Sequence, residues 1–306
     1  MVLPFTLQQL RIVKAVAAEK SFTTAAEILF LSQPSLSKQV KVLENRLGIL
    51  LFNRTNRKLS LTEAGILFLQ YSDRILSLCE ETCRSIEDLK NGERGNLRVG
   101  ASQTIGTYLL PRVLALFAQN YPQINIILQV DSTRIISKSI ENRKIDIALV
   151  GGDVPIELEK NLKVENFVED ELTLIIPKSH PFSLKKNKTI NHDDLYHLNF
   201  ITLNPNSSVY KFIDSTLTQN QIETSQFNTV MQLNSIEAIK TAVSLGLGVA
   251  FVSASAIEKE TKLKTIEIIK IKNIKITRKL AIITNMNCYK SKAFEYFYNE
   301  LRNLKF

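Results

Sequence analysis

Residues 21–40 read SFTTAAEILFLSQPSLSKQV and predict two short helices separated by a tight turn. Thr24 stands three residues before Glu27, which is the spacing of a capping box at the start of a helix. Ser32 then offers a second N-cap, and Pro34 fits the first turn of the next helix because its missing N–H costs nothing there.

The second helix is predicted to have an apolar side and a polar, basic side. Apolar residues recur at steps of four, three and four, at Leu36, Val40, Leu43 and Leu47. The opposite side carries Gln33, Ser35, Lys38 and Lys41. This arrangement is typical of a helix-turn-helix, which inserts its second helix into the DNA major groove. The alternative is an ordinary corner between two helices, with the lysines on a solvated face.

The charge distribution favours DNA binding. Residues 1–62 carry nine Lys and Arg against three acidic residues, which is +6 of the whole-chain net charge of +9. Residues 63–94 carry four basic and seven acidic residues. Because neutralised phosphates supply sequence-independent affinity, a basic block before an acidic helix is typical of a DNA-binding head on a non-binding stalk.

The segments around this motif complete a winged head. Residues 6–20 predict a first helix that packs on the other two, and Gly48 is expected to end the second helix of the motif. Residues 51–61 predict a small two-stranded wing with Arg54 and Arg57 at its tip. Such arginines reach phosphate or the narrow minor groove, the alternative being plain solvated charge.

The predicted DNA-contacting side chains lie near the N-terminal end of the recognition helix and on the wing. Gln pairs bidentately with adenine, whereas Ser and Lys bind base edges or phosphates. For Ser32, helix capping is an equal alternative. The full set is Ser32, Gln33, Ser35, Ser37, Lys38, Lys41, Arg54 and Arg57.

A long helix is expected after the head, capped by Thr62 and running from Glu63 to about Asn91. Its apolar seam is too long for a small head to cover, so we expect it to pair with a second copy in a dimer. The seam residues are Ile66, Leu69, Ile75, Leu78, Cys79, Ile86 and Leu89.

Beyond residue 95 the pattern changes to strands alternating with helices, which predicts two α/β lobes and a cleft between them. Two segments, near 167–171 and 266–279, are expected to cross between the lobes. The predicted fold class is therefore α/β, with a winged helix-turn-helix, a linker helix and a two-lobed effector domain like that of periplasmic binding proteins. Its expected boundaries are 1–62 for the head, 63–92 for the linker helix, 95–306 for the effector domain, 95–168 and 272–306 for lobe I, and 169–271 for lobe II.

Hydroxyl side chains are predicted to gather in this cleft, at the carboxyl ends of strands or at helix N-termini. Hydroxyls and free N–H groups at such positions suit a carboxylate or phosphate ligand. For any one of these residues, the alternative is an ordinary N-cap. The candidate effector-binding residues are Ser102, Thr104, Thr133, Thr202, Ser207 and Ser208.

Other functional classes find little support in the sequence. No apolar run is long enough to span a bilayer, and the N-terminus lacks a signal-peptide pattern. Cys79 and Cys83 stand four apart on a helix, which would allow a redox or metal pair, but small buried side chains are favoured. The three histidines are scattered and no catalytic set is visible, so we expect no enzyme activity, metal or cofactor.

The string AAEILFLSQPSLSKQVKVLENRLGILLFNRTNRKLSLTEAG resembles the N-terminal signature of the LysR-type transcriptional regulators, and DIALVGG and SLGLGVAF extend the resemblance into both lobes. The resemblance implies a homodimer or homotetramer that binds promoter DNA, works with RNA polymerase and responds to a metabolite in the cleft.

Within this family, the strings FTLQQLRIVKAVAAEKSF and VGASQTIGTYLLPRVLALF are similar to the branch that regulates the RuBisCO operon in cyanobacteria and algal plastids. That branch implies an activator in the plastid stroma, or in a bacterial cytoplasm, with a sugar phosphate or NADPH as effector. The alternatives are a LysR-type regulator of another metabolic operon, such as nitrogen assimilation, or a two-lobed solute-binding protein.

Overall fold

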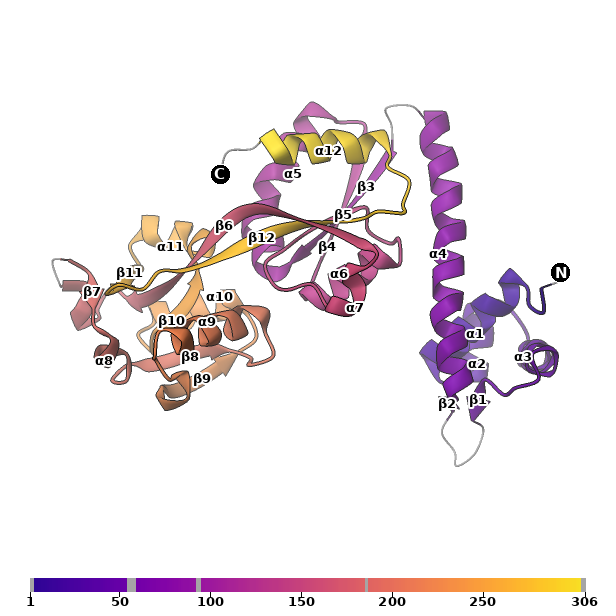
Figure 1. The fold of residues 1–306 in the computed structure, drawn as a ribbon, viewed down its shortest axis with the longest axis horizontal. Helices are drawn as coiled ribbons and strands as arrows, with labels where there is room; N and C mark the ends of the chain where they lie inside the picture. Colours follow the sequence, from indigo (N-terminus) through magenta and orange to yellow (C-terminus); the bar gives the residue numbers. More distant parts are fainter. Residues whose placement is uncertain (1–2, 54–58, 92–94, 185–186, 304–306) are drawn as a thin grey trace. The chain divides into compact units, whose positions relative to one another are not determined.

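The structure is a computed structural model that describes residues 3–53, 59–91, 95–184 and 187–303 (Figure 1). The chain divides into two compact units, residues 1–90 and 91–306. In the described part of the chain, no helix has both the length and the apolar character needed to cross a membrane.

The first unit holds three helices, a two-stranded wing and a long helix. They are α1 (Leu7–Glu19), α2 (Phe22–Ile28), α3 (Gln33–Leu47), β1 (Phe52–Asn53), β2 (Ser60–Leu61) and α4 (Glu63–Asn91). Strands β1 and β2 pair antiparallel, as the alternating residues of the wing predict. The predicted trihelical head with a wing is therefore confirmed.

Side-chain caps set the helix ends of the head. Ser32 Oγ accepts a hydrogen bond from Ser35 N at 3.3 Å, and Gly48 ends α3 in the left-handed region with φ +69°. The prediction that Thr24 caps α2 is wrong, since Ser21 is the cap and accepts from Thr24 N at 3.2 Å. Ser21 has the extended backbone that a cap requires, and α2 therefore begins at Phe22, one turn earlier than the capping-box spacing indicated.

The core of the head comes from the predicted apolar faces. Leu36, Val40 and Leu43 of α3 are buried against α1 and α2. Glu44 is also buried, and its Oε1 accepts from Leu51 N at 2.9 Å and from the next residue's N at 3.3 Å. This carboxylate ties the end of α3 to the start of the wing, a role that its place in the sequence did not reveal.

Helix α4 begins where Thr62 Oγ1 accepts from Gly65 N at 3.0 Å, as predicted. Lys14 of α1 forms an ion pair with Asp73 of α4 at 2.8 Å. Within the described part of this unit, several apolar side chains of α4 remain exposed, among them Ile66, Leu67, Tyr71, Leu78, Ile86 and Leu89.

The second unit is built on a mixed sheet in the order β4-β3-β5-β12-β6-β11-β7, with β10 also paired to β6 (Figure 1). In lobe I, α5 and α12 cover one face of the sheet and α6 and α7 the other. Its elements are β3 (Gly95–Ser102), η1 (Ile105–Leu109), α5 (Leu110–Asn120), β4 (Ile124–Asp131), α6 (Thr133–Glu141), β5 (Ile147–Val150), α7 (Ile156–Glu159) and α12 (Lys292–Asn303). The segment η1 is a π-helix that runs directly into α5.

Lobe II has a core on each face of its strands, one under α9 and one under α10. Strand β8 pairs in parallel with β9 and makes an isolated bridge to Val249, next to β10. The elements are η2 (Pro181–Leu184), β7 (Thr189–Ile190), α8 (His192–Leu195), β8 (Asn199–Leu203), α9 (Ser208–Gln219), η3 (Thr224–Gln226), β9 (Asn228–Leu233), α10 (Ile236–Ser244), β10 (Ala250–Ser253), η4 (Ala254–Ala256), α11 (Glu258–Leu263) and β11 (Ile266–Ile271).

Two long strands join the lobes. Strand β6 (Leu162–Pro177) pairs antiparallel with β12 (Ile276–Asn285) along the whole of β12. Successive residues of β6 face opposite sides, so that Leu174 lies in one lobe II core and Ile175 in the other. The predicted crossing at 167–171 lies within β6. Of the second predicted crossing, 276–279 belongs to β12 and pairs with β6, whereas 266–271 forms β11, which pairs with β6 inside lobe II.

Candidate DNA-binding and effector-binding sites

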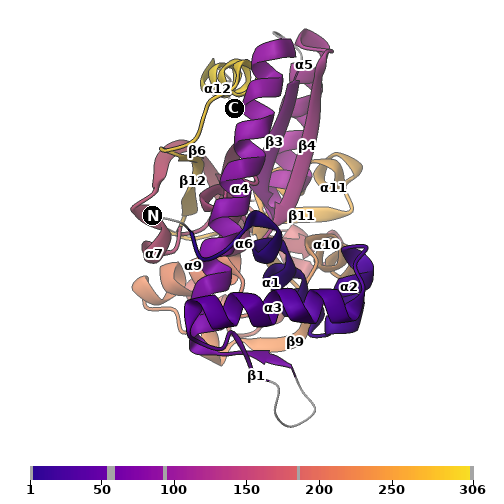
Figure 2. The same cartoon turned by 90° about the vertical axis from the view of Figure 1, so that its right-hand side faces the viewer.

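The recognition helix α3 presents the predicted polar face to solvent. Gln33, Ser35, Lys38 and Lys41 are exposed, and Ser37 is half-buried at the edge of the helix. In Figure 2, α3 faces the viewer with α1 and α2 packed against it. Because the apolar stripe of α3 fills the core of the head, these polar side chains have no competing packing role. Exposed polar side chains along α3 are what major-groove binding requires.

Ser32 and the two wing arginines differ from the rest of the predicted DNA-contacting set. Ser32 caps α3 and is also exposed, so capping does not remove it from the surface. Arg54 and Arg57 lie outside the described residues, as does the tip of the wing. Strand β1 is tied to α3 where Phe52 N donates to Glu44 Oε1, and β2 pairs with β1.

Five of the six candidate effector residues line one cavity of about 230 Å³ between the lobes. Ser102 ends β3, Thr104 precedes η1 and Thr133 begins α6, whereas Ser207 and Ser208 come from the start of α9 in lobe II. The cavity therefore lies where strands end and helices begin, as predicted for a small-ligand site.

The hydroxyls of this cavity differ in whether the protein already uses them. Ser102 Oγ accepts from Gly151 N at 3.2 Å. Thr133 is buried, and its Oγ1 has no hydrogen-bond partner among the described residues. Ser207 occupies the N-cap position of α9 without a capping side-chain hydrogen bond. A buried hydroxyl without a partner costs free energy that a ligand oxygen would recover.

Glycine allows the lobes to approach closely beside the cavity. A Cβ added to Gly152 would lie 2.7 Å from Ser208 Cβ and 3.2 Å from Thr133 Oγ1. Any side chain at position 152 would therefore push α9 away from α6 and change the cavity.

Arg278 is the functional candidate that sequence reasoning missed. It lines the cavity from β12 and is only 3% exposed. Its Nε donates to Asp170 Oδ2 at 2.9 Å and its Nη1 to the carbonyl oxygen of Gly151 at 2.8 Å. Asp170 also accepts from Ser253 Oγ at 2.5 Å. One buried ion pair thus joins the end of a lobe I strand to the end of a lobe II strand.

Asparagines and an aspartate add further polar groups to the cavity wall. Asn204 and Asn234 follow β8 and β9, and Asp131 ends β4. The strand-end rule that identified Ser102 and Thr133 could also have found these three. Arg278 carries no such local signal, because it lies within β12 and not at the carboxyl end of a strand.

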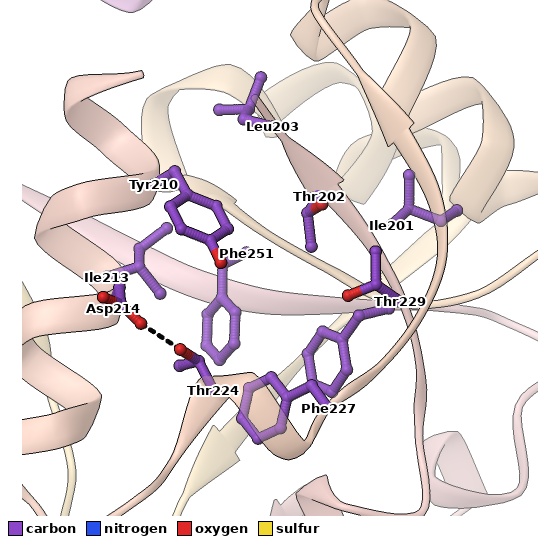
Figure 3. A pocket seen from close by; sticks show the side chains of 11 residues that line it. Ile201, Thr202, Leu203, Tyr210, Ile213, Asp214, Thr224, Phe227, Thr229 and Phe251 are labelled. Carbon is purple, nitrogen blue, oxygen red and sulfur yellow. Dashed lines mark hydrogen bonds between the residues drawn. The ribbon is translucent and has the colours of Figure 1, made fainter. Parts of the chain in front are cut away.

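Thr202 is the one candidate that does not line this cavity. It lies in a smaller pocket of about 40 Å³ inside lobe II, with Tyr210, Phe227 and Phe251 as aromatic walls (Figure 3). The Thr224 hydroxyl donates to the Asp214 carboxylate at the rim of this pocket. The neighbouring residue Leu203 lines both spaces.

The described residues show no group of three or more His, Cys, Asp or Glu side chains suited to hold a metal ion. His192 Nε2 lies 3.0 Å from the carbonyl oxygen of Lys272, and His180 Nδ1 accepts from Phe182 N at 3.2 Å. Burial lowers the pKa of His180. Both histidines therefore have local structural contacts within lobe II.

Comparisons with known proteins identify the two units. Residues 7–66 match the bacterial regulatory helix-turn-helix protein family of the lysR type, and residues 90–305 match the LysR substrate binding domain. A "Probable RuBisCO transcriptional regulator" of Thalassiosira pseudonana is 71% identical over 305 residues, which are 100% of this chain and 99% of the relative. The protein of the same name from Porphyra purpurea is 54% identical over 302 residues, 99% of this chain and 95% of the relative.

Among solved structures, full-length CbnR complexed with its target DNA has the same fold. Its TM-score is 0.70 at 20% identity, covering 98% of this chain and 99% of that one. The matches include the head and both lobes, which excludes the enzyme and solute-binding interpretations. The chain belongs to the LysR family of transcriptional regulators.

Proposed function

We propose that residues 1–62 bind promoter DNA, that residues 63–92 pair two copies of the chain, and that residues 95–306 bind a small effector. The recognition helix would contact bases and phosphates through Gln33, Ser35, Ser37, Lys38 and Lys41, with Ser32 at its cap. Arg54 and Arg57 of the wing would contact the neighbouring phosphates or minor groove.

The observation that carries the DNA-binding assignment is the division of α3 into two faces. Leu36, Val40 and Leu43 are buried in the head and Leu47 is partly buried, while Gln33, Ser35, Lys38 and Lys41 are exposed. The net charge of +6 over residues 1–62 supplies the attraction to phosphate.

A gel-shift titration of the full chain on promoter DNA tests this assignment. Lys38→Ala should weaken binding about tenfold and reduce its salt dependence, because one phosphate or base contact is lost. Lys90→Ala, a lysine in the last turn of α4, is the matched control and should bind like wild type. Equal affinity of Lys38→Ala and wild type would contradict the assignment.

We propose that the regulated genes are the RuBisCO operon, and that the protein activates them with RNA polymerase in the plastid stroma. The support is the 71% identity over the full chain to a relative with that name. The test compares binding to the RuBisCO operon promoter with binding to a nitrogen-assimilation promoter from the same genome. Preference for the second promoter would favour the alternative operon.

The effector is proposed to be a small anionic metabolite, either a sugar phosphate or NADPH. The support is the set of hydroxyls around the cavity, with Thr133 Oγ1 unpartnered and α9 lacking a side-chain cap. The proposed contacts are Ser102, Thr104, Thr133, Ser207 and Ser208. Thr202 would act only through the neighbouring lobe II pocket.

A thermal-shift screen with phosphorylated Calvin-cycle intermediates and NADPH tests the effector assignment. A ligand at about 100 times its Kd should stabilise the fold by about 2.7 kcal/mol. Thr133→Val should lose most of this gain, whereas Thr241→Val should keep it, because the Thr241 hydroxyl donates to the Glu237 carbonyl oxygen within α10. If no compound stabilises wild type, or if both variants respond like wild type, the effector assignment fails.

We propose that α4 mediates a homodimer, which could pair further into a homotetramer. The support is the apolar surface that α4 leaves exposed, including Ile66, Leu78, Ile86 and Leu89. Light scattering on a size-exclusion column should give at least twice the mass of the 34.7 kDa chain. Ile86→Lys with Leu89→Lys should shift the chain towards the monomer.

A further inference from the structure

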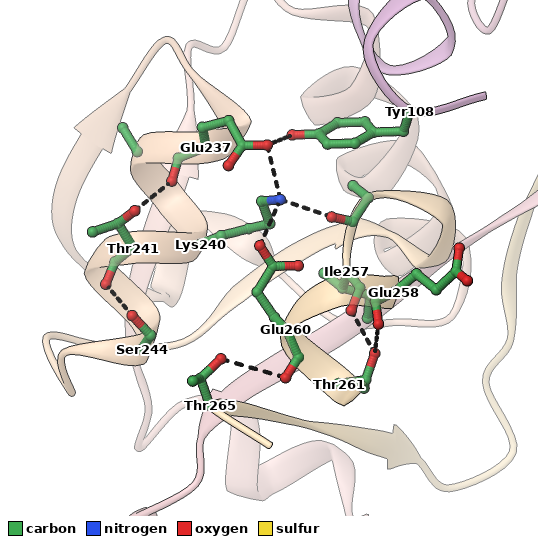
Figure 4. Close-up of polar contacts among 12 residues, drawn as sticks. Tyr108, Glu237, Lys240, Thr241, Ser244, Ile257, Glu258, Glu260, Thr261 and Thr265 are labelled. Carbon is green, nitrogen blue, oxygen red and sulfur yellow. Dashed lines mark hydrogen bonds and ion pairs between the residues drawn. The ribbon is translucent and has the colours of Figure 1, made fainter. Parts of the chain in front are cut away.

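Tyr108 makes a direct contact between lobes I and II of the second unit (Figure 4). It lies on η1 of lobe I, and its hydroxyl donates to Glu237 Oε1 of α10 in lobe II at 2.8 Å. Its ring packs against the lobe II core that includes Ile239 and Val243. One lobe I side chain therefore combines an apolar and a polar contact with the other lobe.

The lobe II side of this contact is organised around a buried lysine. Lys240 is 3% exposed, and its Nζ lies 2.9 Å from Glu237 Oε1, from Glu260 Oε1 and from the carbonyl oxygen of Ala256 (Figure 4). Buried lysines are rare unless they are paired in this way. The three acceptors hold the ammonium in place, 4.7 Å from the centroid of the Tyr108 ring. Lobe II thus offers a fixed cation to the ring and a fixed carboxylate to the hydroxyl.

An exposed ion pair also joins the same two lobes. Arg112 of α5 pairs with Glu258 of α11, with side-chain exposures of 71% and 39%. Exposed pairs contribute little to stability. The Tyr108 contact differs from this pair because it also places the ring against a buried lysine and the lobe II core.

The two elements that carry this contact, η1 and α10, both begin at the effector cavity. Thr104, which lines the cavity, directly precedes η1, and Tyr108 follows four residues later. Asn234 and Ile236 line the cavity at the start of α10, the helix that carries Glu237 and Lys240. The π-helical winding of η1 is rare and often occurs at functional sites. A shift of η1 or α10 at the cavity would therefore move the contact.

We propose that Tyr108, Glu237 and Lys240 form a latch that holds the two lobes closed before any effector binds. If the lobes rotate apart about β6 and β12, the hydrogen bond from the Tyr108 hydroxyl to the Glu237 carboxylate must break. The Tyr108 ring must also move away from the Lys240 ammonium. The latch deepens the proposed function, since it would set how often the cavity is open to an effector. Its existence depends on neither the identity of the effector nor DNA binding.

Hydrogen–deuterium exchange of the full chain, without DNA or effector, tests the latch. Tyr108→Phe removes only the hydroxyl, and it should raise exchange about 3- to 10-fold in residues 105–109 and 236–244. Tyr298→Phe is the matched control, because Tyr298 Oη donates to Glu165 Oε2 at 2.7 Å entirely within lobe I. This control should leave residues 236–244 unchanged.

Two results would overturn the latch. One is unchanged exchange in both segments of Tyr108→Phe. The other is an equal rise in residues 236–244 for both tyrosine variants, since that would reflect general loosening of the fold. Glu237→Ala removes the acceptor from the lobe II side and should reproduce the Tyr108→Phe pattern. Failure of the gel-shift or thermal-shift experiments would leave these outcomes unaffected.

Discussion

Two of the polar contacts between the lobes, Asp170–Arg278 and Tyr108–Glu237, differ in burial and in what they join. Asp170 and Arg278 lie on the strands that cross between the lobes, and both are buried. Tyr108 and Glu237 lie on helices that are separate in the two lobes, and Glu237 is 62% exposed. The first contact stays intact when the lobes rotate about the strands, whereas the second must break. Asp170–Arg278 is therefore a contact at the hinge between the lobes, the hinge contact. Tyr108–Glu237 is a contact that forms only when the lobes are together, the closure contact.

The largest effect is expected at the hinge contact. Arg278→Met would leave the Asp170 carboxylate buried without its cation, which should cost about 3–5 kcal/mol of stability. Urea denaturation, followed by the unfolding of the effector unit, measures this loss. Arg134→Met is the control, since its ion pair with Glu157 is exposed on both sides and should contribute less than about 1 kcal/mol. Similar losses in the two variants would contradict the comparison.

An intermediate effect is expected from the lysine of the latch. Lys240→Met would leave Glu237 and Glu260 facing each other without a cation, at a cost of about 2–3 kcal/mol. Lys262→Met removes a comparable ion pair to Glu258, but this lysine is 75% exposed and its loss should fall within about 0.5 kcal/mol. Melting temperatures of the two variants, measured side by side, sharpen the distinction between buried and exposed pairs.

The smallest effect is expected from pH. Burial alone would raise the pKa of Glu237, but hydrogen bonds from Lys240 and Tyr108, together with nearby Lys259, lower it below its ordinary 4.5. The stability from this carboxylate is therefore present above pH 4.5 and lost as pH falls through the lowered pKa. Burial and the hydrogen bond to Glu237, with the further charge of Glu260, raise the pKa of Tyr108 above its ordinary 10, so the hydroxyl stays a donor at neutral pH.

The difference in free energy of unfolding between wild type and Glu237→Gln, measured as a function of pH, tests this dependence on pH. At pH 7 we expect about 1 kcal/mol or less, because the carboxylate is largely exposed. The difference should shrink below pH 4.5. A difference that stays constant between pH 7 and pH 3 would show that the charge of Glu237 does not contribute.

The head was the part of the fold most accessible from sequence. Its helix ends and the apolar faces of its helices depend on residues three or four positions apart, such as Ser32 with Ser35 and Leu36 with Val40. The error at Thr24 was also local, because two hydroxyls one turn apart could each begin α2. The buried role of Glu44 was missed because its partners are backbone N–H groups of the following loop, and these have no sequence signature.

The effector unit was predictable only where its residues follow a local rule. Ser102 and Thr133 end strands or begin helices, and the structure brings them to one cavity. Arg278 reaches the same cavity from 127 residues beyond Gly151, whose carbonyl oxygen it contacts. The latch likewise joins residues 129 positions apart. Contacts of this separation depend on strand order, which no spacing within the sequence reveals.

The shared strand pair also has a consequence for synthesis on the ribosome. Lobe I needs β12 and α12 to complete its sheet and core, although its first strand begins at Gly95. Nearly all of lobe II must therefore be translated before lobe I can complete its fold. The head can fold early, because its contacts are closer in sequence. In a nascent chain, the head would thus be folded before the two lobes are complete.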